Sequence, residues 1–264
     1  MRVVFMVVLA AAMLLPTTAK ASDTVAQTML AAQRARVESA DYRVSGHLVK
    51  VDESGTRTSY PISIKARWFP GVLRILFEVG PPSKAGEAPS AGPRVPVHIL
   101  LAMRPSGKNS ILIAHPGDKG ALALPFEKWG EGLLGTNFSY EDLLEAEYFW
   151  GGQTSLGEAK FGARDCDILK SAPGAAEASY YAEVKSWLDH GIGFPVYVEK
   201  TLKDGAVKEF TYFGLRQTGG VWSASQIEAK MRGHAGSTLL IIDRGTPKAN
   251  LGLKDFSPEQ LMHF

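Results

Sequence analysis

The sequence contains one cysteine, Cys166, and almost no excess of either charge, with 29 basic against 27 acidic residues. A single cysteine excludes an internal disulfide. The net charge of +2 gives no electrostatic reason to expect a nucleic acid or an anionic membrane surface as partner. The apolar run from Val3 to Leu15 is too short to cross a bilayer as a helix, which takes about 20 residues.

Complete catalytic and metal-binding motifs are also missing. The six histidines are scattered and form no HExxH pair, so a zinc site has little support. No G-x-S-x-G elbow occurs, and Gly191 to Val196 lacks the third glycine of a dinucleotide fingerprint. Asp165 and Asp167 could be a metal pair, but we interpret them as solvated carboxylates that flank an inward-facing Cys166. We therefore expect no enzyme, no metal site and no cofactor.

The N-terminus has the pattern of a secretory signal peptide. Arg2 precedes the apolar run, and Ala19-Lys20-Ala21 fits an A-x-A cleavage site. No cysteine follows the run, so no residue there could take a lipid anchor. We expect residues 1–21 to be removed after Ala21 and residues 22–264 to form one exported domain.

The first part of this domain is predicted to be a helix, over residues 22–40. Ser22 or Asp23 can cap it, and Val25, Met29, Ala32 and Arg36 fall on one stripe. The remainder favours strands. Residues alternate between apolar and polar from Tyr42 onward, which is the period of a strand with one buried face.

Counting such segments gives about ten or eleven strands, in the order of an antiparallel meander, with two or three helices. Lys203-Asp204-Gly205 indicates a hairpin. The segments VHILLAM and SILIAH are almost wholly apolar and are expected to be covered on both faces. Residues 81–96 hold five prolines and are predicted to be a loop. Near the end, Ser257 and Pro258 mark a short helix start.

The stretch LLGTNFSYEDLLEAEY, residues 133–148, crowds four carboxylates beside aromatic residues. Ser139 stands three positions before Asp142, close to a capping box. Glu145 and Glu147 are expected to face water. We interpret the stretch as a capped helix, in which Asp142→Ala should cost about 1 kcal/mol. The alternative, an acidic catalytic cluster, would need a cleft and a raised pKa.

The same stretch resembles the G-S-D-F-S-Y-E-D-L signature of outer-membrane lipoprotein-sorting-like proteins. Further similar segments follow in order: GARDCDILKSAP, FPVYVEKTLKDGAVKEFTYF, GGVWSASQIEAKM, STLLIID and LKDFSPEQL. The resemblance covers roughly residues 40–264. It implies membership in the LolA/LolB-like superfamily of lipoprotein carriers. It also implies a mainly β (α+β) fold, in which one curved antiparallel sheet forms an unclosed barrel with helices plugging or lidding its concave side.

The function implied by the resemblance is that of a periplasmic carrier or binding protein for lipoprotein acyl chains or other envelope lipids. An inner- or outer-membrane transport component would be a further partner. Two alternatives stay open: an envelope scaffold that binds a protein through a sheet edge, and a lipid hydrolase using Asp142 or His115. The candidate lipid-binding residues are the apolar side chains expected to line the hollow, namely Met29, Tyr60, Ile62, Ile64, Trp68, Leu73, Ile75, Phe77, Phe138 and Leu144.

Overall fold

The computed structural model describes residues 18–82 and 95–264. Most of the predicted signal peptide, residues 1–17, lies outside this range, as do residues 83–94 of the predicted proline-rich loop. Among the described residues, no helix is long and apolar enough to cross a membrane.

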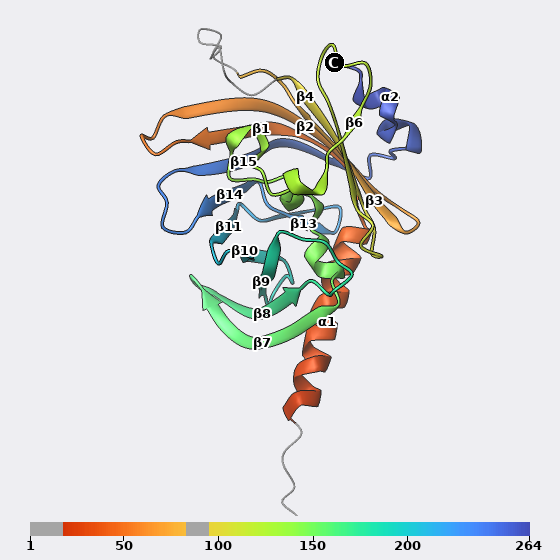
Figure 1. Ribbon diagram of the computed structural model, residues 1–264. Coiled ribbons are helices and arrows are strands. Elements are labelled where there is room, and N and C mark those ends of the chain that lie inside the picture. The colour runs from red at the N-terminus through yellow and green to blue at the C-terminus, as the bar shows by residue number, and fades with distance from the viewer. Residues whose placement is uncertain (1–17, 83–94) are drawn as a thin grey trace, which may run out of the picture.

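The predicted fold class is confirmed: one large, curved antiparallel sheet dominates the molecule (Figure 1). It has 13 strands rather than ten or eleven, and β12 and β13 form a separate small sheet. The strands are β1 Asp41–Val51, β2 Arg57–Phe69, β3 Val72–Val79, β4 Val97–Met103, β5 Ser110–Ala114, β6 Leu122–Ala123, β7 Gly152–Phe161, β8 Arg164–Ala172, β9 Tyr181–Asp189, β10 Pro195–Leu202, β11 Val207–Phe213, β12 Arg216–Thr218, β13 Val221–Ser223, β14 Gln226–Met231 and β15 Ser237–Pro247.

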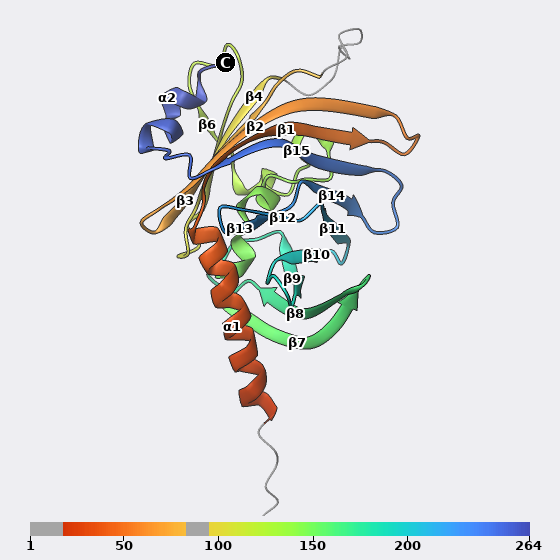
Figure 2. The same ribbon diagram turned by 180° about the vertical axis from the view of Figure 1, so that it is seen from behind.

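The sheet does not close into a barrel. Its strand order is β6-β5-β4-β3-β2-β1-β15-β14-β11-β10-β9-β8-β7, so β6 and β7 are the two edges. Neighbours in this order are mostly neighbours in the chain, as expected for hairpin connections. The long connection between the two edge strands runs into the hollow of the sheet, where it lies between β1 and β2 above and β7 and β8 below (Figures 1 and 2).

Most helical segments are short. The α-helices are α1 Thr18–Glu38 and α2 Pro258–Leu261, and the 3-10 helices are η1 Phe126–Lys128, η2 Leu133–Gly135, η3 Glu141–Leu144, η4 Ala146–Phe149 and η5 Leu253–Phe256.

Helix α1 begins earlier than predicted, so Ser22 and Asp23 lie inside it rather than at its start. The predicted stripe was also wrong by about one position. Val25 and Ala32 are exposed, Arg36 is half-buried, and the buried stripe runs through Ala26, Met29, Leu30, Gln33 and Val37.

The larger of two hydrophobic cores fills the concave side of the sheet. The alternation predicted for the second and third strands holds there, because Tyr60, Ile62 and Ile64 on β2 and Ile75 and Phe77 on β3 are all buried in this core. The core also contains residues from α1 and from the connection between the sheet edges.

A smaller core lies on the convex side, where η5 and α2 cover β3 and β4 (Figure 1). Leu76 and Leu100 face outward there and pack with Phe256 and Leu261. Every residue of β4 is buried, so the prediction that this strand is covered on both faces is confirmed. The predicted start of α2 is also confirmed, because Ser257 accepts a hydrogen bond from the Gln260 amide and Pro258 takes the first helical position.

Candidate functional site

The candidate lipid-binding residues lie together on the concave side of the sheet. All except the half-buried Trp68 are buried, and all pack within the larger core. The inward sides of β2, β3 and β4 form what we call the apolar wall. Phe138 and Leu144 come from the connection between the sheet edges and pack in the same core.

Residues 126–149 of that connection, which we call the plug, occupy the hollow (Figure 1). The plug is a series of four 3-10 helices rather than the single capped helix predicted from sequence. It folds on itself, since the amide of Leu133 donates to the carbonyl of Phe138 and the amide of Glu141 donates to the carbonyl of Trp129. The predicted role of a helical element that plugs the hollow is therefore confirmed, with a different local structure.

Asp142 is the centre of a buried polar cluster. Its Oδ2 accepts from Lys208 Nζ at 2.7 Å and from the amide and the hydroxyl of Ser139 at 2.8 Å each. Its Oδ1 accepts from the Tyr181 hydroxyl at 2.7 Å and lies 3.5 Å from Lys200 Nζ. Burial alone would raise the pKa of Asp142, but the Lys208 and Lys200 ammonium groups outweigh burial and hold this pKa well below its usual range.

Lys200 joins this cluster to a second plug carboxylate. Its Nζ lies 3.1 Å from Glu147 Oε1, and its ammonium also approaches the ring of Phe210 to 5.3 Å. Burial alone would lower the pKa of Lys200, but Glu147 and Asp142 raise it well above its usual range. The side chains of Lys200 and Glu147 are 6% and 7% exposed, so the pair is shielded from water.

A third plug carboxylate, Glu141, binds the start of β9. Its Oε1 accepts from the Ser179 hydroxyl at 2.5 Å and its Oε2 accepts from the Tyr180 amide at 2.9 Å. Burial raises the pKa of Glu141, and these two hydrogen bonds partly oppose the shift. Together the three carboxylates attach the plug to β9, β10 and β11.

The structure corrects two predictions about this stretch. Glu147 does not face water but is buried against Lys200. Asp142 does accept the Ser139 amide, as a capping box would require, yet this is only one of its contacts. Glu145 is half-exposed and lies 3.2 Å from Arg36 Nη2. The four carboxylates therefore serve different partners.

Sequence reasoning missed Lys200 and Lys208, although the sequence contains a signal for them. Lys200 shares the inward phase of β10 with Val196 and Val198, and Lys208 shares the inward phase of β11 with Phe210. The predicted Lys203-Asp204-Gly205 hairpin is confirmed, and its register sets Lys200 directly opposite Lys208. A lysine among the inward-facing residues of each strand of the hairpin indicates that a buried anionic group lies beside the two lysines.

Helix α1 holds the far end of the plug. Arg34 Nε donates to the carbonyl of Tyr148 at 2.8 Å, and Arg36 pairs with Glu145. The Arg36 guanidinium also lies over the ring of Tyr148, 5.6 Å from its centre. These contacts place α1 against η4, beside β7.

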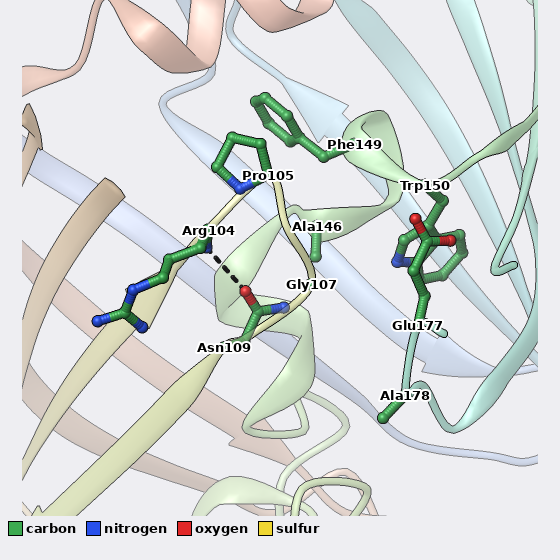
Figure 3. A pocket seen from close by; sticks show the side chains of 9 residues that line it. All are labelled: Arg104, Pro105, Gly107, Asn109, Ala146, Phe149, Trp150, Glu177 and Ala178. Carbon is green, nitrogen blue, oxygen red and sulfur yellow. Dashed lines mark hydrogen bonds between the residues drawn. The ribbon is translucent and has the colours of Figure 1, made fainter. Parts of the chain in front are cut away.

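One recess opens where the curved sheet fails to close. It has a volume of about 250 Å³ and lies between the β4–β5 turn, the end of the plug and the segment before β9. Its lining side chains come from these three segments and are drawn in Figure 3: Arg104, Pro105, Gly107, Asn109, Ala146, Phe149, Trp150, Glu177 and Ala178. Part of this volume is open to solvent, and the enclosed space is far smaller than that of a ligand pocket, which measures about 300–1,000 Å³.

The environment of Asp142 does not suit a general base. A general base works best with a pKa near the operating pH, whereas the lysines lower the pKa of Asp142 far from it. The other residue named for this alternative, His115, follows β5, and its Nδ1 lies 3.4 Å from the carbonyl of Pro96.

One group on the sheet could hold a metal ion. Ligand atoms of Glu158, Asp167 and His190 lie within 4.8 Å of one another. Glu158 and His190 are exposed, and His190 Nε2 already lies 3.2 Å from Asp167 Oδ2. Cys166 is fully buried between Asp165 and Asp167, as predicted.

Comparisons with solved structures agree with this fold. A proposed outer membrane lipoprotein-sorting protein domain from Vibrio parahaemolyticus has a TM-score of 0.77 and 20% identity, covering 93% of this chain and 100% of its own. A DUF1329 family protein from Desulfovibrio piger has a TM-score of 0.74 and 13% identity, covering 90% and 98%. A LolA superfamily protein from Nitrosomonas europaea has a TM-score of 0.63 and 14% identity, covering 89% and 98%.

A search of curated proteins gave no significant match. A family model described as "-like: Uncharacterized protein" matches residues 125–263, which is just over half of the chain. The match begins at the plug and continues through the strands that carry the buried lysines. This match shows that the chain belongs to that family of uncharacterized proteins, and its fold is shared with the lipoprotein-sorting and LolA superfamily structures.

Proposed function

We propose that the protein is a carrier or binding protein for lipoprotein acyl chains or other envelope lipids, acting in the periplasm after removal of residues 1–21. The observation that supports this most is the apolar wall. The unclosed sheet presents a continuous apolar concave surface on β2, β3 and β4, and the plug covers this surface. The two lipoprotein-sorting and LolA superfamily neighbours share this sheet.

The lipid must compete with the plug in this proposal. The recess at the gap is too small for a whole acyl chain, and the candidate residues are already buried against Phe138 and Leu144. An acyl chain gains about 0.8 kcal/mol for each buried methylene. A chain that enters at the gap and replaces plug side chains on the apolar wall would therefore offset the plug contacts that it removes.

Uptake of a fluorescent acyl probe tests the proposal. Ile75→Glu puts a charge on the apolar wall and should abolish uptake. Arg43→Glu is the matched control, because Arg43 is exposed and lies opposite Lys65 on the neighbouring strand. Native mass spectrometry of protein purified from an envelope extract should also find bound lipid. A folded protein that carries no lipid and takes up no probe would contradict the proposal.

A second candidate function is that of an envelope scaffold for a protein partner. The filled hollow and the ten-residue edge strand β7 favour it, because in the described part of the chain β7 is hydrogen-bonded in the sheet only to β8. An extended peptide could add to such an edge. Leu156 is 47% exposed on this strand. In this case Leu156→Pro should abolish partner capture from an envelope extract and leave lipid content unchanged.

A further inference from the structure

The two buried lysines form an unusual feature of the concave surface. Lys200 on β10 and Lys208 on β11 are direct cross-strand partners, and their side chains are 6% and 7% exposed. Like charges placed directly opposite each other destabilise a sheet. This pair therefore needs anions beside it.

The plug supplies those anions. Within the described ranges, the carboxylates in ion-pair distance of the two lysines are Asp142 and Glu147, and both belong to the plug. The sheet itself contributes the Tyr181 hydroxyl, which accepts from Lys208 Nζ at 3.0 Å, and the rings of Tyr181 and Phe210. The sheet thus provides a preformed cationic site, and the plug provides its occupant.

Stability alone does not explain this arrangement. Replacing a buried ion pair by apolar residues of similar size is often neutral or stabilising. The apolar wall already seats the other side of the plug without any charge. A charged site is useful when its anion has to be exchanged, because an uncompensated buried ammonium strongly favours whichever anion is present.

The backbone of the plug is strained on both sides of Asp142. Leu134 and Glu145 have φ values of 54° and 46°, in the left-handed region that favours glycine. Such conformations are costly for residues other than glycine and are concentrated in switch regions and ligand clamps. Departure of the segment between them would release this strain.

We propose that Lys200 and Lys208 bind the anionic group of a single-chain amphiphile, a carboxylate or a phosphate, which replaces Asp142 and Glu147 when the plug leaves the hollow. The alkyl chain has an apolar path from this site. Lys200 lies over Phe210, and Phe138, which packs edge-on against Phe210 at 5.6 Å, departs with the plug. This inference rests on the proposed function and specifies the class of ligand.

The test compares two variants that both lack the plug carboxylates. One is Asp142→Asn/Glu147→Gln, and the other adds Lys200→Met and Lys208→Met. Affinities for dodecanoate, dodecyl phosphate and the neutral dodecanol are measured for each by calorimetry, with circular dichroism as the check of folding. The double variant should bind at least one anionic probe about tenfold more tightly than dodecanol, which is the scale of a charged hydrogen bond.

In the quadruple variant this preference should vanish while dodecanol binding remains. If the quadruple variant does not fold, Asp142→Asn/Glu147→Gln/Lys208→Met takes its place. This triple variant keeps Lys200 and should lose most of the preference for the anionic probe over dodecanol. The relative affinity for dodecanoate and dodecyl phosphate shows whether the two lysines prefer a carboxylate or a phosphate. An equal preference for the anionic probes over dodecanol with and without the lysines would overturn this inference and leave the proposed function standing. Failure of the double variant to bind any of the three probes, dodecanol included, would instead remove the proposed function and the inference with it.

Discussion

The two sides of the hollow hold the same plug in different ways. Apart from Tyr60, the only buried polar side chain among the described residues of β1 to β5 is His98, which faces the convex side under α2. On β8 to β11, by contrast, Ser171, Tyr181, Ser186, Lys200 and Lys208 are all buried, and we call the inward side of these strands the polar wall.

The two walls therefore contribute differently: the apolar wall holds apolar groups by burial, and the polar wall fixes the position of the plug. Apolar burial is roughly proportional to area and has no direction, so the apolar wall can hold the plug, an acyl chain or another apolar segment. The polar wall instead fixes which plug residues lie where, because each donor and acceptor has a specific partner. Tyr148, for example, places its hydroxyl 3.3 Å from Ser186 Oγ. Removing one member of such a network leaves its partner buried and unsatisfied.

The largest expected effect comes from breaking the polar wall. Asp142→Ala should destabilise the protein by about 3–5 kcal/mol, because it leaves two buried lysines short of a counter-charge. Urea unfolding measures this loss. Asp165→Ala, which removes an exposed carboxylate paired with Lys160, should leave the midpoint unchanged. A loss of only about 1 kcal/mol for Asp142→Ala would return this residue to the role of a simple cap.

A change of shape on the apolar wall should have a smaller effect. Ile75→Leu conserves volume and polarity at a buried position that faces the plug, and it should cost less than about 1.5 kcal/mol. The same urea experiment applies. A loss as large as that of Asp142→Ala would show that the apolar wall also specifies the plug by close fit, and the contrast between the walls would disappear.

The convex side offers a comparison outside the hollow. Ser257 caps α2 by accepting from the Gln260 amide at 3.1 Å, so Ser257→Ala should cost about 1 kcal/mol. Because α2 packs in the smaller core and the plug in the larger one, acyl uptake should not change. A Ser257→Ala protein of reduced stability that also loses uptake would show that the two cores are coupled.

The smallest expected effect is a dependence on pH through His98. Burial lowers its pKa, while the Leu261 carbonyl and Glu78 oppose the shift and Lys65 adds to it. The unfolded chain has a histidine pKa of about 6.5, so the stability that neutral His98 provides is complete above that pH and is lost as the pH falls toward the lower folded value. Thermal unfolding between pH 7.5 and 5 should therefore show a smaller decline in His98→Gln than in the native sequence.

Much of the fold could be predicted because it follows from local patterns. The alternation in β2 and β3, the Asp204-Gly205 turn and the Ser257 cap each depend on residues close together in the chain. The 3-10 structure of the plug was missed and a single capped helix was predicted instead, because Leu134 and Glu145 adopt left-handed conformations that their side chains do not favour. Tertiary contacts impose those conformations.

The polar cluster could not be assembled from sequence for a different reason. Glu147 in isolation has the pattern of a solvated residue, and only its contact with Lys200, far along the chain, makes it a buried one. The candidate residues of the apolar wall could be named because period 2 assigns them to one face. Whether lipid shares that face with the plug depends on the stability of the plug, which no periodicity encodes.

The central claim is that the plug and an acyl chain compete for the apolar wall. The Asn137 amide donates to Thr238 Oγ1 at 2.9 Å, so these residues of the plug and of β15 are in direct contact. Asn137→Cys/Thr238→Cys would tether the plug to β15 when oxidised and release it when reduced, and the one native cysteine, Cys166, is buried. Uptake of a fluorescent acyl probe is measured on the same sample before and after reduction. We expect no uptake by the oxidised protein and uptake after reduction; equal uptake in both states would contradict the claim.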